Sequence, residues 1–389
     1  MSGLAASLLL AACGGTGSGS AGSGGPGADS GVIEATTGQC GGAWQLPGPG
    51  PHTFTIYNGA SDGTDVYLAN PHTGAIFAQV EGLGPGTTDP MTVDVGSGTY
   101  AFECVTEDFN PIFGPAETVS GHVAGTPGVL PVTSADLVPA SKQYHTYVQA
   151  GLATLVTQVT TLDGDLRSGN LTAAKRDWLT AHLTYQRLGA AYGTFDTPST
   201  DYDSEIDGRP DGLPKGVNDP GFTGFYRVEY GLWHGQSAAQ LTGPAGTLVR
   251  DVRQLQSAWP SLEVNLLDMG LRTHEILENA LEFQLSGHDD YGSGSTLATT
   301  EANVQGTLEL LSLLHPLLVP RYPQLPAVYT ALDSLQSLLQ GQQRPGGQWV
   351  SVADLSATAH EQIDAACDQA LTVLAPVAVI TEPRLVATP

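Results

Sequence analysis

FTGFYRVEYGLWHG, residues 222–235, lies within a long region of helical periodicity and contains a polar pair in a largely apolar stretch. Tyr226 and Glu229 are three residues apart, so on a helix they face the same side with Cβ atoms about 5–6 Å apart. A histidine and a carboxylate at this spacing would indicate a metal site, but here the first residue is a tyrosine. The stretch is therefore either a metal site with an unusual ligand or a packed aromatic side chain beside a surface acid.

Helical periodicity extends on both sides of this stretch, and we expect an all-helical domain over residues 134–380. Asn170 is a suitable N-cap, while Gly169 and Gly193 are suitable helix ends. Bundles of this kind place ligand sites between facing helices. The predicted helices are 140–169, 170–193, 222–235, 247–286, 296–319, 326–340 and 351–376.

Residues 31–125 show a β pattern instead, with short alternating runs such as HTFTIYNG (52–59) separated by Gly and Pro. This pattern predicts a small sandwich or barrel. Cys40 and Cys104 bracket the segment, and we expect them to form a disulfide, which export would permit. Cys367 lies in a helical pattern and is predicted to be a buried free thiol.

The N-terminal residues 1–13 are typical of a bacterial lipoprotein signal, because an apolar run ends at Leu10-Ala11-Ala12-Cys13. We expect cleavage before Cys13 and lipidation of its thiol. Residues 14–30 are rich in Gly and Ser and would form a flexible tether. This predicts an extracytoplasmic protein held on the outer face of the cell membrane by lipid alone, with no transmembrane helix elsewhere in the chain.

The charge balance is strongly acidic, with 14 Lys and Arg against 39 Asp and Glu and a formal net charge of −25. Nucleic-acid binding needs a basic surface, so the composition argues against that class of partner. An acidic surface raises the local concentration of cations. The same balance would also serve solubility alone.

Two further segments carry candidate ligands. In RTHEILENALEFQLSG (272–287), His274 and Glu278 are four residues apart and share a helix face. In TDYDSEIDGRPDG (200–212), acids crowd one loop that lacks the spacing of an EF-hand. Each segment is either part of a metal site or a solvated acidic surface, and spacing alone leaves both alternatives open.

Several motifs together resemble the EfeO family of iron-uptake proteins. DPGFTGFYRVEYGLWHG (219–235) and THEILENALEFQLSGHDDYGSGSTLATTEANVQGT (273–307) resemble its imelysin-like domain, and GTYAFEC (98–104) resembles a strand of its cupredoxin-like domain. The resemblance implies a multidomain chain: a small all-β cupredoxin-like sandwich followed by an all-α imelysin-like helical bundle. It also implies an extracytoplasmic iron-binding transport component, not an enzyme. The implied partners are a membrane iron permease and a haem peroxidase-like protein.

The resemblance implies a metal site that is altered in this chain. The family pattern Gly-x-His-x-x-Glu has Tyr226 in place of histidine, and Gln186 follows Tyr185 where the family tends to have glutamate. A tyrosinate is a hard oxygen donor, so we expect Fe(III) to be favoured over Fe(II). The expected metal residues are Asp207, Tyr226, Glu229, His274 and Glu278.

A blue-copper centre is not expected in the β domain, because no His or Met follows Cys104 in the short loop where such a site would place them. Two alternatives to iron transport stay open. One is a docking or structural lipoprotein whose metal site has degenerated. The other, less favoured, is an imelysin-type metallopeptidase: a zinc peptidase needs HExxH, and Glu278 stands where its second histidine would be.

Overall fold

The computed structural model describes residues 29–46, 48–197 and 199–384. The expected signal, Cys13 and most of the expected tether lie outside the described residues. The last two tether residues, Asp29 and Ser30, begin strand β1. The chain divides into two compact units. One holds the described residues up to Pro71 together with Phe77–Pro127, and the other holds His72–Ile76 together with the chain from Gly128.

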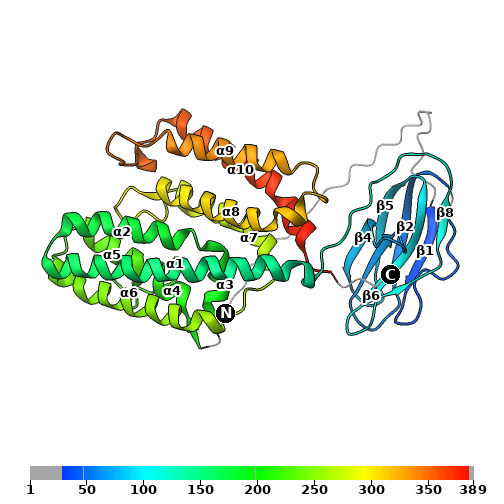
Figure 1. The fold of residues 1–389 in the computed structure, drawn as a ribbon, viewed down its shortest axis with the longest axis horizontal. Coiled ribbons are helices and arrows are strands. Elements are labelled where there is room, and N and C mark those ends of the chain that lie inside the picture. The colour runs from blue at the N-terminus through cyan, green and yellow to red at the C-terminus, as the bar shows by residue number, and fades with distance from the viewer. Residues whose placement is uncertain (1–28, 47, 198, 385–389) are drawn as a thin grey trace, which may run out of the picture. The chain divides into compact units, whose positions relative to one another are not determined.

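The N-terminal unit consists of two β-sheets (Figure 1). In one sheet the strand order is β1-β2-β5, with β1 parallel to β2 and β2 antiparallel to β5. In the other the order is β4-β3-β6-β7, and β8 also pairs with β6. The strands are β1 Asp29–Ala35, β2 Gly50–Asn58, β3 Thr64–Ala69, β4 Ile76–Leu83, β5 Thr88–Val95, β6 Gly98–Thr106, β7 Ile112–Phe113 and β8 Glu117–Val119.

Both sheets contribute to one hydrophobic core, because alternate residues of each strand point inward. Phe54 of β2 and Phe102 of β6 meet edge to face with ring centroids 5.2 Å apart, and Trp44 packs on both. Cys40 and Cys104 are joined by a disulfide with Cα atoms 5.6 Å apart, the pairing that the sequence predicts. Cys104 therefore offers no thiolate to a metal.

The C-terminal unit is a helical bundle around a second core (Figure 1). A two-residue strand pair, β9 Asp196–Thr197 with β10 Thr200–Asp201, interrupts its otherwise helical structure. The helices are α1 Ser134–Ser168, α2 Leu171–Gln186, α3 Tyr192–Phe195, α4 Tyr202–Ile206, α5 Gly224–Trp233, α6 Ala238–Ala258, α7 Asp268–Asn279, α8 Thr296–Leu318, α9 Leu325–Gln340 and α10 Ala357–Thr381.

Two of the helices predicted from sequence are interrupted in the structure, and two others are shifted, since α1 already begins at Ser134 and α10 spans Ala357–Thr381. The segment 170–193 stops being a regular helix at Gln186, and Gly189 shortly after it makes continuation of α2 costly. The segment 247–286 is two helices, α6 and α7, because Pro260 lacks the N–H group that would extend α6. After α7 the chain continues as a π-helical segment, Ala280–Leu285.

Helix α10 is long and apolar enough, by length and composition, to cross a membrane, with a mean hydropathy of 1.5 over its best window. The expectation that no segment after the signal passes this test is therefore wrong. In the structure α10 packs against α7 and α9, and Ile363, Cys367 and Leu374 lie in the bundle core. Only 28% of that window is buried, and a single such helix is weak evidence for a membrane span because the test uses length and composition alone.

Candidate metal centre

Two glycines bring the loop after α4 against the start of α5. Gly208 and Gly224 have φ angles of 75° and 71°, in the left-handed region that favours glycine. A Cβ atom on Gly208 would lie 2.0 Å from the carbonyl oxygen of Thr223, so no larger residue fits. The close approach lets the N–H of Tyr226 donate to the carbonyl oxygen of Asp207 at 3.1 Å. Asp207 and Tyr226, 19 positions apart in the chain, thereby become neighbours.

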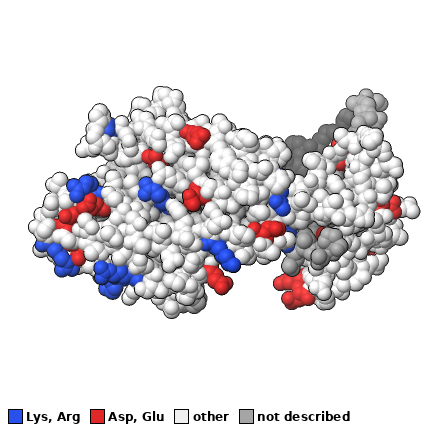
Figure 2. All heavy atoms as spheres, viewed as in Figure 1, with Lys and Arg blue, Asp and Glu red and all other residues white. Residues whose placement is uncertain are grey.

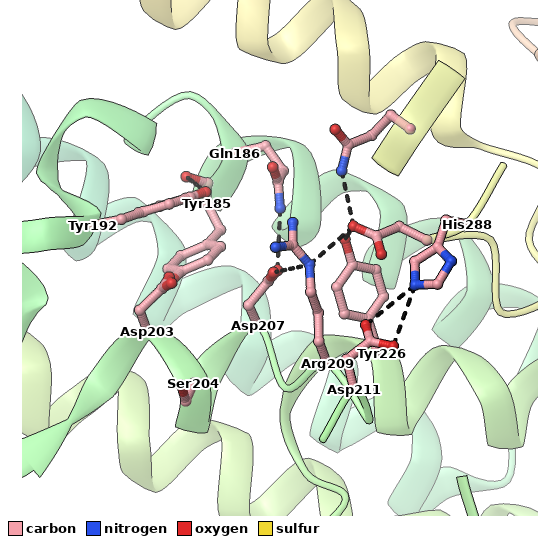
Figure 3. Close-up of polar contacts among 12 residues, drawn as sticks. Tyr185, Gln186, Tyr192, Asp203, Ser204, Asp207, Arg209, Asp211, Tyr226 and His288 are labelled. Carbon is pink, nitrogen blue, oxygen red and sulfur yellow. Dashed lines mark hydrogen bonds and ion pairs between the residues drawn. The ribbon is translucent and has the colours of Figure 1, made fainter. Parts of the chain in front are cut away.

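The carboxylate of Asp207 is buried and hydrogen-bonded by the protein itself (Figure 3). Its Oδ1 accepts from Nε2 of Gln186 at 3.1 Å and lies 3.8 Å from Nε2 of His182. Its Oδ2 lies 3.7 Å from Nε of Arg209. His182 is also buried and its Nδ1 has no hydrogen-bond partner. Gln186 stands where the family pattern tends to have glutamate, and here its side chain donates a hydrogen bond to Asp207.

Tyr226 is buried among acids. Its hydroxyl donates to Oδ2 of Asp289 at 3.1 Å. Burial, and then the charge of Asp207, hold the pKa of Tyr226 well above its ordinary value. Without a bound cation the phenol therefore stays protonated, and a directly bound cation would be needed to favour the phenolate.

Asp289 is the residue on which this polar group converges. Besides Tyr226, its Oδ2 accepts from Nε of Arg209 at 3.0 Å and from Nε2 of Gln284 at 3.0 Å. Gln284 lies in the π-helical segment, a local irregularity that often occurs at functional sites. Burial raises the pKa of Asp289, although Arg209 opposes that shift.

Glu229 lies one turn beyond Tyr226 on α5 and is 1% exposed. Its Oε1 accepts from the N–H of Ser293 at 3.0 Å, and its Oε2 has no partner. Burial raises the pKa of Glu229 to about 8, against the lowering effect of the Ser293 hydrogen bonds. The buried Oε2 of Glu229 therefore has neither a hydrogen-bond donor nor a cation to compensate for its burial.

The structure does not bring His274 and Glu278 to this group. Arg272, Ile276 and Asn279 are the α7 residues that line the adjoining cavity. At 3.6 residues per turn, His274 and Glu278 lie about 200° and about 240° round the helix from Arg272. They instead pair with each other at 3.6 Å, with side chains 27% and 61% exposed. The expectation that they share an inward face with the other ligands is therefore wrong.

A polar cavity of about 210 Å³ adjoins Asp207. Asp203 and Arg209 lie in its wall, and the hydroxyl of Tyr185 donates to Asp203. Burial, and then the charge of Asp207, raise the pKa of Asp203 to about 7. Charged groups of both signs thus surround a small cavity, whereas Figure 2 shows large uncharged areas on the outer face that it displays.

A second group lies beside the first. Asp211, His288 and Asp289 have ligand atoms that all lie within 4.8 Å of one another, and Figure 3 shows His288 pointing toward Asp211. Within the described ranges this is the one such cluster of His, Cys, Asp and Glu. Sequence reasoning missed His288 and Asp289, and it treated Asp211 only as one acid of a crowded loop. The available signal was the run Gly287-His288-Asp289-Asp290 directly after the acidic helix.

Comparisons with known proteins match the helical unit. The model of the imelysin family, peptidase family M75, matches residues 140–377. The iron uptake system component EfeO of Yersinia pestis is 27% identical over 264 residues, which cover 67% of this chain and 68% of that protein. EfeO of Escherichia coli O1:K1 / APEC is 26% identical over 252 residues, 64% of each chain. The resemblance to EfeO is confirmed.

Among solved structures, a protein described as an iron-regulated protein A precursor from Parabacteroides distasonis is similar with a TM-score of 0.46 and 14% identity. The match covers 64% of this chain and 98% of that one.

Proposed function

The chain belongs to the imelysin family, and from that premise we propose that it is an extracytoplasmic component of an iron-uptake system that binds iron in its helical unit. Its similarity to proteins named as iron uptake system components supports this proposal. The proposed ligands from the expected set are Asp207, Tyr226 and Glu229. His274 and Glu278 are left out because α7 turns them away from the group.

The observation that carries the proposal is the set of buried oxygens around Tyr226. Glu229 keeps an unpartnered Oε2 at 1% exposure, and the phenol of Tyr226 lies among carboxylates and stays protonated, donating a hydrogen bond to Asp289. A buried acid without a partner costs free energy unless a cation or donor compensates it. A bound cation would supply that compensation.

We propose Fe(III) over Fe(II) as the ion. The three side chains offer only oxygen, and oxygen ligands suit hard cations. A trivalent ion would also favour the phenolate of Tyr226, which the protein alone does not ionise. The buried imidazole of His182 lies 3.8 Å from Asp207 and would be an additional donor.

The remaining parts of the proposal concern context. We propose that the two-sheet unit is a cupredoxin-like sandwich that orients the protein, that lipid on Cys13 anchors it to the membrane, and that it delivers iron to a membrane permease. A haem peroxidase-like partner follows from the family resemblance alone.

A docking or structural role with a degenerate metal site is the second candidate. The observation that favours it is Arg209, whose guanidinium faces both Asp207 and Asp289 and so already supplies them with a cation. Peptidase activity has less support, because His274 pairs with Glu278 near the surface and has no second histidine four residues on.

The test is a titration of the metal-stripped mature protein with Fe(III)–nitrilotriacetate, followed in the visible range for a phenolate-to-iron charge-transfer band. We expect a saturable band in the wild-type protein and its loss in Tyr226→Phe. Tyr185→Phe is the matched control, since Tyr185 is also buried and hydrogen-bonded to an aspartate but does not contact Asp289.

Saturable iron binding without a band would keep the transport function and remove Tyr226 from the ligands. No iron binding at all would favour the docking role. A band that disappears equally in both variants would point to unfolding, which circular dichroism of each variant detects.

A further inference from the structure

We propose that Asp211, His288 and Asp289 form a second cation site, separate from Asp207, Tyr226 and Glu229, that takes a borderline divalent transition metal. This inference deepens the proposed function and rests on it for its biological role. The ligands of the second site, however, are different residues from those of the proposed iron site.

The spacing of His288 and Asp211 fits a metal ion, and a ligand atom of Asp289 lies within 4.8 Å of both. Nε2 of His288 lies 3.2 Å and 3.3 Å from the two carboxylate oxygens of Asp211. Ligand atoms around a tetrahedral ion at about 2.1 Å lie about 3.4 Å from one another. An ion could therefore enter between His288 and Asp211 with small movements of two half-exposed side chains.

Asp289 supplies the independent observation that a ligand belongs here. Its side chain is 1% exposed, and its Oδ1 has no hydrogen-bond partner. Its Oδ2, in contrast, already accepts from Tyr226, Arg209 and Gln284. The three donors hold the carboxylate in one orientation, as outer partners do for metal-binding carboxylates, and leave one oxygen to bind.

The surrounding contacts also hold the two loops together. The guanidinium of Arg209 lies over the ring of Phe283 at 4.5 Å, and the N–H of Asp289 donates to the carbonyl oxygen of Phe283 at 3.1 Å. Asp211 follows Arg209 by two residues, and His288 precedes Asp289. The chain next to Asp211 and next to His288 is therefore held in place. Metal binding then costs less conformational entropy than it would in two free loops.

A plain ion pair between His288 and Asp211 is the simpler explanation, and it accounts for only part of the arrangement. Both side chains are 51% exposed, and exposed pairs contribute little to stability. The pair does not satisfy Oδ1 of Asp289, which is buried and needs a donor or a cation. A shared metal ion satisfies all three side chains at once.

The donor set selects the class of ion. One imidazole nitrogen and two carboxylates suit borderline divalent metals such as Fe(II) or Zn(II), whereas the three proposed iron ligands Asp207, Tyr226 and Glu229 offer only oxygen. Because Tyr226 is hydrogen-bonded to Asp289, only the Asp289 carboxylate would separate an ion at the second site from the phenol of Tyr226. We infer that the second site takes up a divalent cation from solvent. The bound cation would then lie beside the buried group of Asp207, Tyr226 and Glu229.

The test uses Zn(II) alone, which is redox-inert, titrated calorimetrically into the metal-stripped mature protein. We expect His288→Ala and Asp211→Asn each to weaken Zn(II) binding at least tenfold. His274→Ala is the matched control, because it removes the histidine of another partly exposed His–carboxylate pair, which belongs to no three-ligand cluster among the described residues. We expect that control to bind Zn(II) as the wild-type protein does.

Unchanged Zn(II) affinity in both His288→Ala and Asp211→Asn would overturn the second site, as would an equal loss in His274→Ala. The Fe(III) titration of the wild-type protein separates this result from the proposed function. An Fe(III) band without His288-dependent Zn(II) binding leaves the iron function and removes the second site. His288-dependent Zn(II) binding without any iron binding does the reverse. Both substituted side chains are half-exposed, and a thermal melt confirms that each variant is folded.

Discussion

Nε of Arg209 lies 3.0 Å from Oδ2 of Asp289, the same oxygen that accepts the hydroxyl of Tyr226. Its guanidinium also faces Asp207. Burial lowers the pKa of Arg209, but the charge of Asp207, followed by Tyr226 and Asp289, raises it above its ordinary value. The protein thus contains an internal cation between the carboxylates that are proposed to attract a metal.

Arg209→Gln should tighten Fe(III) binding, because it removes a positive charge that repels the incoming ion and competes for the same carboxylates. We expect an improvement of about tenfold in Kd, equivalent to about 1.4 kcal/mol. Competition with a chelator of known affinity measures the change.

Arg272→Gln is the control for charge alone. Arg272 lines the same cavity, but it pairs with Glu275 at 2.9 Å and with Asp268. Weaker iron binding in Arg209→Gln would instead make Arg209 a support of the site.

Gly208→Ala should destabilise the helical unit strongly, because the new Cβ would lie 2.0 Å from the carbonyl oxygen of Thr223. Gly212→Ala is a close control, since Gly212 has a similar φ of 80° and nothing within 4 Å of the added atom. We expect Gly212→Ala to cost about 1–2 kcal/mol from backbone strain, and Gly208→Ala to cost more than about 3 kcal/mol. Urea denaturation gives both values, and equal losses would show that the close contact is not rigid.

The stability of the helical unit should fall as pH rises from about 4 to about 7, through Asp203. Its folded pKa of about 7 lies above the ordinary value of 3.8, so the folded state binds the proton more tightly. The stabilisation is complete below about pH 4 and is lost as pH approaches 7.

Asp203→Asn removes this titration and keeps an acceptor for Tyr185. Between pH 4 and pH 7, the unfolding free energy of the variant should rise by about 1–2 kcal/mol relative to that of the wild-type protein. The full pKa shift would give about 1.4 kcal/mol per pH unit. We expect a smaller total because the cavity admits solvent, which screens the charge of Asp203. A difference that does not change with pH, measured by urea unfolding at several pH values, would contradict the assignment.

Removal of the disulfide should destabilise the β unit. Cys40 and Cys104 close a loop with a sequence separation of 64, for which the chain-entropy model gives about 4 kcal/mol. In Cys40→Ala/Cys104→Ala we expect the β unit to unfold at a lower temperature, by scanning calorimetry, while the helical transition is unchanged. A reductant should lower the wild-type transition and leave that of the double variant where it is.

The sequence alone determined which segments are helices and strands where a regular period ran without interruption. Predicted helices 296–319 and 326–340 agree closely with α8 and α9, because apolar residues at helical spacing must face a core. The same signal failed at 247–286. There a single proline divided a stretch whose period continued on both sides.

Only the tertiary structure decided which polar residues meet. Periodicity shows which residues share a helix face, but not which face turns inward, so His274 and Glu278 were placed on the wrong side of α7. Tyr226 meets Asp289 across 63 positions, and His288 meets Asp211 across 77. Such contacts depend on how the helices pack and on the close approach of Gly208 to Thr223, and spacing along the chain carries no record of either.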